Sequence, residues 1–279
     1  MPRHSASRPA SRAWSPLRRI ASLAALVGAA ACASKATVAP APVVVPKAPP
    51  PPDGRTVIQT MNDRYIGKFY MTLTYKQNVS IIGANRRETR QVWNHYLTLP
   101  GRQRIDYVPL ASKSGVLYAD GRLYSFTNGK VANTQPGWHP LLVLTGDVYT
   151  QMPDTTVMQL DSLGFDLSIA RKDTWEGREM WVVGAAAGDS TSSQFWVDTD
   201  SLLVRRIIQR ETRSGRVTMN ETRYLNYKPV AGYPVPHSMR AYRDGRLYFR
   251  GESVNVREGE RLPVELFEPQ SWATSQLKR

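Results

Sequence analysis

The sequence predicts a mainly β domain with a few helices: a curled antiparallel sheet of about eleven strands, an incomplete barrel, with a helical lid. Apolar and polar residues alternate in many short segments between residues 71 and 256, as in strands with one buried face. Asp-Gly, Asn-Gly and Ser-Gly pairs separate these segments, and such pairs favour tight hairpin turns. A central stretch, residues 138–163, lacks alternation. Because so wide a sheet must curl or close, it offers a concave face for this stretch to cover.

The amino-terminal residues are typical of a secretory signal peptide. Five arginines and no acidic residue precede residues 20–31, twelve residues without a charge. Twelve helical residues rise about 18 Å, short of the roughly 30 Å hydrocarbon core, so a membrane-spanning helix is not expected.

Cys32 is the only cysteine of the 279 residues, and it directly follows this apolar run. The preceding residues 29–31, Ala-Ala-Ala, resemble a bacterial lipobox, which implies that residues 1–31 are a lipoprotein signal peptide and that Cys32 is the lipidation site, carrying acyl chains such as palmitate. Ala33 after the cysteine implies the outer membrane, with the anchored protein facing the periplasm. The alternative is an ordinary signal peptide that leaves Cys32 as an idle thiol.

The mature chain divides by composition. Residues 32–53, the acylated cysteine and a segment rich in Pro and Ala, predict an extended tether. Residues 54–269 have the length and pattern of one domain, which we expect to be monomeric, and residues 270–279 form a tail.

The domain begins with a predicted helix. Asp53 suits its N-cap and Gly67 its end. Four apolar residues, spaced four apart, share one face of this helix and its continuation: Val57, Met61, Tyr65 and Phe69.

Predicted strands follow. The first places Met71, Leu73, Tyr75 and Gln77 on one side, and the next two join through Pro100-Gly101. Turns are expected at five further residue pairs: Asp120-Gly121, Asn128-Gly129, Glu176-Gly177, Ser214-Gly215 and Asp244-Gly245.

The central stretch suits two short helices, one after Pro140 and one from Pro153 to the C′ residue Gly164. We expect them to cover the mouth of the sheet. Their apolar residues are the lid candidates: Leu141, Leu142, Leu144, Leu160 and Leu163.

The chain is strongly basic, with a net charge of +14 from 37 basic and 23 acidic residues. Such an excess can indicate nucleic acid or an anionic membrane. The signal peptide argues against nucleic acid as a partner, and single arginines along alternating strands favour a solvated sheet face.

The sequence indicates no enzyme, cofactor or metal site. His95, His139 and His237 lie far apart, without zinc-ligand spacing. There is no Gly-x-Ser-x-Gly elbow, phosphate loop or dinucleotide fingerprint.

Four segments together resemble the lipoprotein-carrier (LolA/LolB-like) superfamily of outer-membrane lipoprotein-sorting proteins. They are YIGKFYMTLTYKQNV, LTLPGRQRIDY, ADGRLYSF and ELFEP, in this order. The resemblance covers residues 54–269 and implies an incomplete barrel that binds the acyl chains of lipids or lipoproteins, for sorting or lipid transfer. Soluble carriers have an arginine directly before the proline at 100, where this chain has Leu99, so a membrane-anchored acceptor is the better analogue.

Aromatic residues at alternate strand positions are candidates for the wall of an apolar cavity. The candidates are Trp93, Tyr107, Tyr124, Trp181 and Trp196. Core packing is the other interpretation of each. A cavity lined by apolar side chains favours a lipid-binding function, whereas one filled with packed aromatic rings favours an envelope interaction or stress-sensor module without lipid transport.

Overall fold

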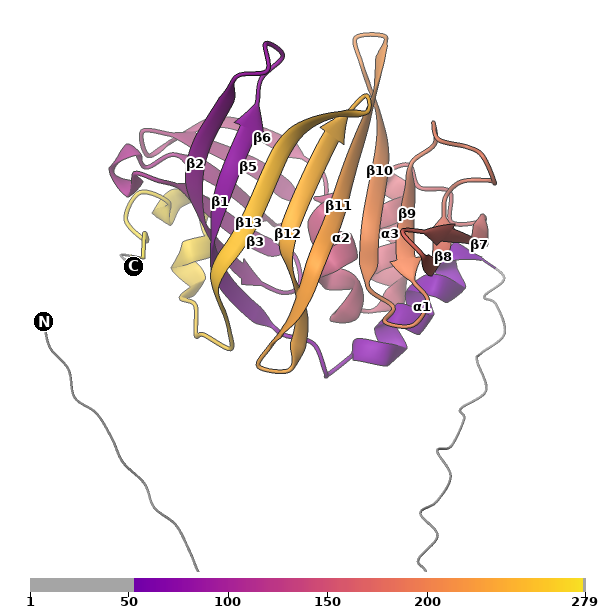
Figure 1. Ribbon diagram of the computed structural model, residues 1–279. Helices are drawn as coiled ribbons and strands as arrows, with labels where there is room; N and C mark the ends of the chain where they lie inside the picture. Colours follow the sequence, from indigo (N-terminus) through magenta and orange to yellow (C-terminus); the bar gives the residue numbers. More distant parts are fainter. Residues whose placement is uncertain (1–52, 278–279) are drawn as a thin grey trace, which may run out of the picture. The chain divides into compact units, whose positions relative to one another are not determined.

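The computed structural model describes residues 53–277 (Figure 1). The expected signal peptide, Cys32 and all but the last residue of the tether lie outside the described residues. Residues 49–279 form one compact unit, which contains every described helix and strand and their core. A chain that begins at Pro49 therefore has all the elements of the fold.

A single antiparallel sheet of thirteen strands, not closed into a barrel, dominates the described residues. The first six strands are β1 (Thr72–Ile82), β2 (Glu88–Thr98), β3 (Arg102–Tyr107), β4 (Gly115–Ala119), β5 (Arg122–Thr127) and β6 (Lys130–Pro136). The other seven are β7 (Ala170–Trp175), β8 (Arg178–Val183), β9 (Gln194–Asp198), β10 (Val204–Arg213), β11 (Arg216–Val230), β12 (Tyr233–Arg243) and β13 (Arg246–Glu258).

The strand order is β6-β5-β4-β3-β2-β1-β13-β12-β11-β10-β9-β8-β7, two meanders joined by the antiparallel pair β1 and β13. The prediction of a curled, open antiparallel sheet is confirmed, with thirteen strands where the sequence indicated about eleven. All seven residues of β6 are exposed, so no buried face marks that edge strand in the sequence.

The hairpin turns lie where the sequence placed them. In each of the five predicted pairs, the residue before the glycine and the glycine itself have positive φ. Both central residues of a type I′ turn need this conformation, which is why Asn-Gly and Asp-Gly pairs favour it.

Helix α1 (Gly54–Tyr65) begins at its predicted N-cap, where the Asp53 carboxylate accepts from the Thr56 N–H at 2.8 Å. It lies very close to β8, because a Cβ on Gly54 would stand 2.4 Å from Val183 Cγ1. The helix ends before Gly67, as predicted, and Phe69 beyond it still contacts Tyr65, at 5.5 Å between ring centroids.

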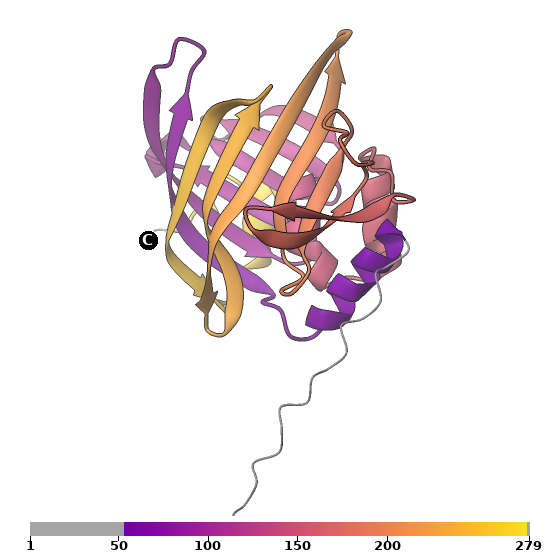
Figure 2. The same cartoon turned by 45° about the vertical axis from the view of Figure 1, so that its right-hand side comes forward.

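The segment between the two edge strands is helical, as predicted. It comprises α2 (Pro140–Thr145), the 3-10 turn η2 (Asp147–Tyr149) and α3 (Pro153–Ser162). Figures 1 and 2 show α2 and α3 on the concave side of the sheet, behind β9 to β11. The two helices and η2 share one core cluster with α1 and the inner faces of the strands.

The carboxyl-terminal residues 259–277, which include the 3-10 turns η3 (Val264–Phe267) and η4 (Pro269–Ser271), pack on the outer side of β3 and β4. Trp272 lies in the segment that the sequence suggested as a tail, yet it is 1% exposed. It stacks on Phe126 at 4.0 Å and covers the guanidinium of Arg104, which is fully buried and paired with Asp106 at 3.0 Å.

Candidate functional site

The concave face of the sheet encloses a chamber of about 380 Å³. Strands β1 to β4 form one wall, β11 to β13 form the other, and α2 covers it. Its volume lies in the lower part of the range of about 300–1,000 Å³ typical of small-molecule pockets.

Strand alternation explains how the sequence builds the chamber wall. Alternate residues in the part of β1, β2 and β3 beside the chamber line it, because alternate side chains share one face of a strand. The lining residues of these strands are Leu73, Tyr75, Gln77, Trp93, His95, Leu97, Gln103, Ile105 and Tyr107. Across the strands, Trp93 pairs with Tyr107 and Tyr75 with His95.

Ring contacts hold the wall residues in place. The Trp93 ring lies 5.0 Å from that of Tyr107 and 5.5 Å from that of Phe249 on β13, measured between centroids. Tyr75 stacks on His95 at 4.3 Å. These contacts are near the preferred range for aromatic pairs, so the rings are packed against one another while the chamber beside them stays open.

The chamber carries no formal charge at neutral pH. Among the described residues, no Asp, Glu, Lys or Arg lines it. Burial lowers the pKa of His95 to about 3 and that of His139 to about 4, so both rings are neutral. Gln103 Nε2 lies 3.3 Å from His95 Nδ1. An uncharged, largely apolar ligand therefore meets no desolvated charge here.

Helix α2 is the cover of the chamber. Its Leu141, Leu142 and Thr145 line the chamber, and Leu142 is 5% exposed. At its amino end, His139 Nδ1 accepts from the Leu141 N–H at 3.3 Å, while the His139 ring contacts that of Tyr118 at 4.1 Å. The lid is thus tied to β4 through a wall residue.

A second connection ties the lid segment to the turn between β2 and β3. The Asp147 carboxylate accepts from the Gly101 N–H at 2.8 Å, and Leu99 packs so tightly on Gly146 that a Cβ there would stand 2.7 Å from Leu99 Cδ2. Asp147 is 1% exposed, and desolvation raises its pKa to about 7 against the effect of the Gly101 N–H. An apolar contact and one carboxylate thus hold the turn between β2 and β3 to the lid.

The structure brings four of the predicted site residues together at the chamber: Trp93, Tyr107, Leu141 and Leu142. Leu144, Leu160 and Trp181 are instead buried in the main core, and Leu163 packs against it. Tyr124 lies against the carboxyl-terminal cluster, and Trp196 packs with Met180 and Val182 on the other face of the sheet. Cys32 lies outside the described residues.

Several lining residues are not among the candidates that the sequence suggested. Tyr75, His95 and Gln103 belong among them, as do Met239 and Phe249. The signal that could have found them is the alternation itself, because they occupy the same strand faces as the nominated Trp93 and Tyr107.

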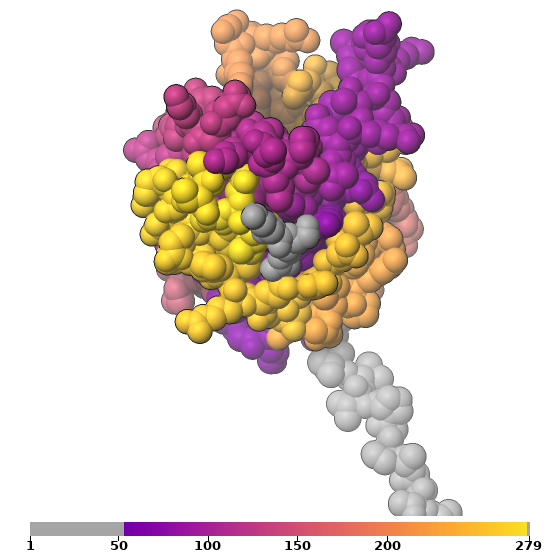
Figure 3. All heavy atoms as spheres, turned by 90° about the vertical axis from the view of Figure 1, so that its left-hand side faces the viewer, coloured from indigo at the N-terminus to yellow at the C-terminus, as the bar shows by residue number. Residues whose placement is uncertain are grey.

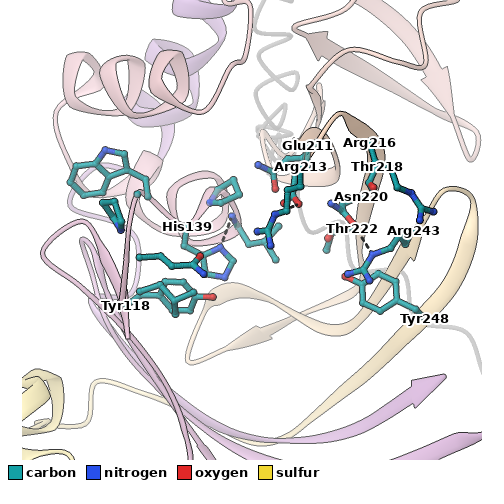
Figure 4. A pocket seen from close by; sticks show the side chains of 18 residues that line it. Tyr118, His139, Glu211, Arg213, Arg216, Thr218, Asn220, Thr222, Arg243 and Tyr248 are labelled. Atoms are coloured by element: carbon teal, nitrogen blue, oxygen red, sulfur yellow. Dashed lines mark hydrogen bonds and ion pairs between the residues drawn. The ribbon is translucent and has the colours of Figure 1, made fainter. Parts of the chain in front are cut away.

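The chamber opens into a polar entrance of about 680 Å³ (Figure 4). The two spaces share a set of lining residues: Tyr118, His139, Leu141, Thr222 and Tyr248. Beyond them, Glu211, Arg213, Arg216 and Arg243 line the entrance, and the guanidinium of Arg243 lies 4.7 Å from the centre of the Tyr248 ring. A molecule reaching the chamber by this route passes charged groups first and apolar groups afterwards.

No set of three His, Cys, Asp or Glu side chains within residues 53–277 could hold a metal ion. In the same part of the chain, no helix is both long enough and apolar enough to span a bilayer.

The chain has an open, curled antiparallel sheet, helices that connect its two edge strands, and a chamber on its concave face. Two solved structures share this fold. A putative outer membrane lipoprotein-sorting protein domain from Vibrio parahaemolyticus is similar, with a TM-score of 0.52 and 11% identity over 79% of this chain and 98% of that one. A DUF1329 family protein from Desulfovibrio piger is similar with a TM-score of 0.51 and 14% identity, over 77% and 95% of the two chains.

A LolA superfamily protein from Nitrosomonas europaea has a TM-score of 0.49 and 11% identity, over 77% of this chain and 97% of that one. No protein-family model and no curated protein matches the sequence. At these identities the similarity concerns the fold, and the function must be argued from the chamber.

Proposed function

We propose that this protein is a lipid- or lipoprotein-binding protein of the cell envelope, which takes an acyl chain into the chamber beneath α2. The observation that carries the proposal is the chamber itself: a space of about 380 Å³, free of formal charge and walled mainly by apolar and aromatic side chains. Chambers of this kind are where apolar ligands bind. The protein acts in this proposal as a binding protein and not as an enzyme.

The lid supports reversible entry. Helix α2 has six residues, and the polar contacts of the lid segment include the His139 cap, the Asp147 bond to Gly101 and two bonds from Asn62 to the carbonyls of Val148 and Gln151, beside the apolar fit of Leu99 on Gly146. Segments with few such contacts belong to the less stable part of a fold and open without global unfolding.

Membrane attachment through acylated Cys32 belongs to the same proposal. A diacylated cysteine would hold the protein at the outer membrane facing the periplasm, because two chains anchor stably where one is marginal. The neighbour described as an outer membrane lipoprotein-sorting domain supports an envelope role of this kind. Changing Cys32 to Ser should leave uncleaved precursor and abolish labelling by a fatty-acid analogue.

A second candidate function is an envelope interaction or stress-sensor module of the same fold. The packed rings of Trp93, Tyr107 and Phe249 favour it, since they already fill part of the concave face. In that case the chamber exchanges no lipid.

The test uses the chain 49–279, purified without detergent. We expect mass spectrometry to find a co-purified acyl lipid, and a fluorescent acyl probe to bind. Ala241→Leu should weaken probe binding at least tenfold, because Ala241 lines the chamber and the larger side chain occupies it. Ala186→Leu is the matched control, since Ala186 is exposed in the loop between β8 and β9. Absence of both lipid and probe binding would favour the sensor module.

A further inference from the structure

Three hairpin turns at one end of the sheet carry arginine on both sides or at the centre of the turn. They join β1 to β2, β10 to β11 and β12 to β13. Their sequences are NRR (residues 85–87), RSGR (213–216) and RDGR (243–246). Figure 3 shows the hairpins of β1–β2 and β10–β11 standing apart at this end, with a hollow between them.

The register brings the turns to the same end. Ile81 of β1 pairs with Phe249 of β13, and Asn220 of β11 pairs with Arg243 of β12, so the three turns project beyond neighbouring strand ends. The opposite end of the same strands holds residues 68–72 and 258–261.

These turns border two adjoining openings. One is the entrance to the chamber, and the other, of about 910 Å³, lies between the turns and shares Arg216, Arg243 and Tyr248 with it. Five arginines line the two openings: Arg86, Arg213, Arg216, Arg243 and Arg246. Against them stand only Glu211 and Asp244, so five positive and two negative charges leave +3. We call these five arginines the arginine rim.

The carboxylates do not neutralise the rim. Arg216 lies 4.0 Å from Asp244 and Arg213 lies 3.7 Å from Glu211, and both arginine side chains are about four-fifths exposed. Exposed pairs of this length contribute little, so the guanidinium groups can exchange them for phosphate oxygens.

Apolar side chains lie among the rim residues. Ile81, Ile82 and Leu247 line the opening between the turns, and Val217 beside Arg216 is 42% exposed. Basic groups with apolar residues between them match a bilayer interface, where the cations meet anionic headgroups and the apolar groups enter the acyl boundary.

We propose that the arginine rim is a docking surface for an anionic lipid bilayer, which places the entrance of the chamber against the membrane. Membrane docking is a second property, separate from the proposed acyl binding. It would serve that binding by shortening the path of an acyl chain between the bilayer and the chamber. The basic excess of the chain is therefore, in part, a built patch and not only a solvated sheet face.

The experiment measures co-flotation of the chain 49–279 with vesicles of phosphatidylcholine, with and without phosphatidylglycerol, at low salt. We expect binding to the phosphatidylglycerol vesicles only, and its loss as salt rises. The variant Arg86→Gln/Arg216→Gln/Arg246→Gln changes one exposed arginine per turn and should weaken binding about 100-fold, at about fivefold for each basic residue.

The control variant, Arg64→Gln/Lys68→Gln/Arg261→Gln, removes the same charge from exposed residues at the other end of the strands and should bind as the parent does. Equal binding to both kinds of vesicle, salt-independent binding, or equal loss in the two variants would overturn the proposal. So would a short DNA duplex that binds through the same arginines more tightly than the phosphatidylglycerol vesicles do. Vesicle docking needs no occupied chamber, so failure here leaves acyl-probe binding to be judged separately.

Discussion

Two parts of the same concave face differ in how they are filled. Under β7 to β10, α1 contacts β8 and α2 contacts β10, α3 and the turn η2 pack on these helices, and Leu160, Phe195 and Val204 are fully buried. Under β1 to β4 and β11 to β13, only α2 covers the sheet, and the chamber remains. The strands alternate in the same way in both parts.

Strand alternation therefore determines which side chains point inward. The helices determine whether those side chains are packed against other residues or face an open space. On the filled side, Tyr149 of η2 reaches Phe69 at 4.4 Å and donates from its hydroxyl to the Leu202 carbonyl at 3.2 Å. On the open side, α2 lies over the sheet with the chamber beside it, and Trp93 and Tyr107 pack on each other at 5.0 Å between ring centroids.

The largest expected effect is on stability, which should differ between substitutions in the filled and the open part of the concave face. Leu160→Ala should lower the free energy of unfolding by about 2–5 kcal/mol, because Leu160 is fully buried among well-packed neighbours. Leu142→Ala should cost less than the lower end of that range, since part of the Leu142 side chain faces the chamber. Urea denaturation of the chain 49–279 measures both, and a larger loss for Leu142→Ala would show that the lid is ordinary core.

The next largest effect is expected on the pH dependence of stability. It depends on Asp147, whose carboxylate binds the turn between β2 and β3. Its pKa is raised from 3.8 to about 7 in the folded protein, so the folded state holds the proton more tightly than the unfolded state does. The stability that this proton contributes is present below about pH 4 and is lost as the pH rises through about 7, an effect on the order of a few kcal/mol.

Asp147→Asn keeps an acceptor for the Gly101 N–H and cannot ionise. We therefore expect it to be more stable than the parent at pH values above about 7, with the difference vanishing towards about pH 4. Denaturation midpoints across this range measure the effect. Asp154→Asn, which removes an exposed carboxylate of α3, is the control for the loss of one surface charge.

A smaller effect is expected on ligand retention. Leu142→Ala should weaken binding of a fluorescent acyl probe about tenfold, roughly the loss expected from removing one to two kilocalories of apolar contact. Leu144→Ala is the informative partner, because Leu144 is buried in the main core and does not line the chamber. It should destabilise the protein, while the folded fraction keeps its affinity for the probe. If Leu144→Ala weakens probe binding and Leu142→Ala does not, Leu144 and not Leu142 faces the ligand.

The sequence predicted the features that depend on local patterns. Turn pairs such as Asp244-Gly245 specify positive φ by themselves. Alternation nominated Trp93 and Tyr107, which line the chamber, but also Tyr124 and Trp196, which do not. It could not separate Leu142 from Leu144, because both are apolar residues of one short helix and only tertiary packing decides which meets the chamber. Nor could it predict the burial of Arg104 against Trp272, which lies 168 residues further along the chain. The arginine rim was hidden for the same reason: its turns are far apart in sequence and meet only through strand register.

The smallest expected effect concerns the residues before the domain. Both parts of the concave face are completed by residues after Asp53, and the Asp53 carboxylate already caps α1 through the Thr56 N–H. The Pro- and Ala-rich composition of residues 33–52 gives them little apolar surface to offset the entropy of ordering. A chain that begins at Asp53 should therefore have the same melting temperature and the same probe affinity as one that begins at Ala33. A fall of several degrees in the shorter chain would mean that these residues dock on the domain. A change in probe affinity without a change in melting temperature would place them at the chamber entrance.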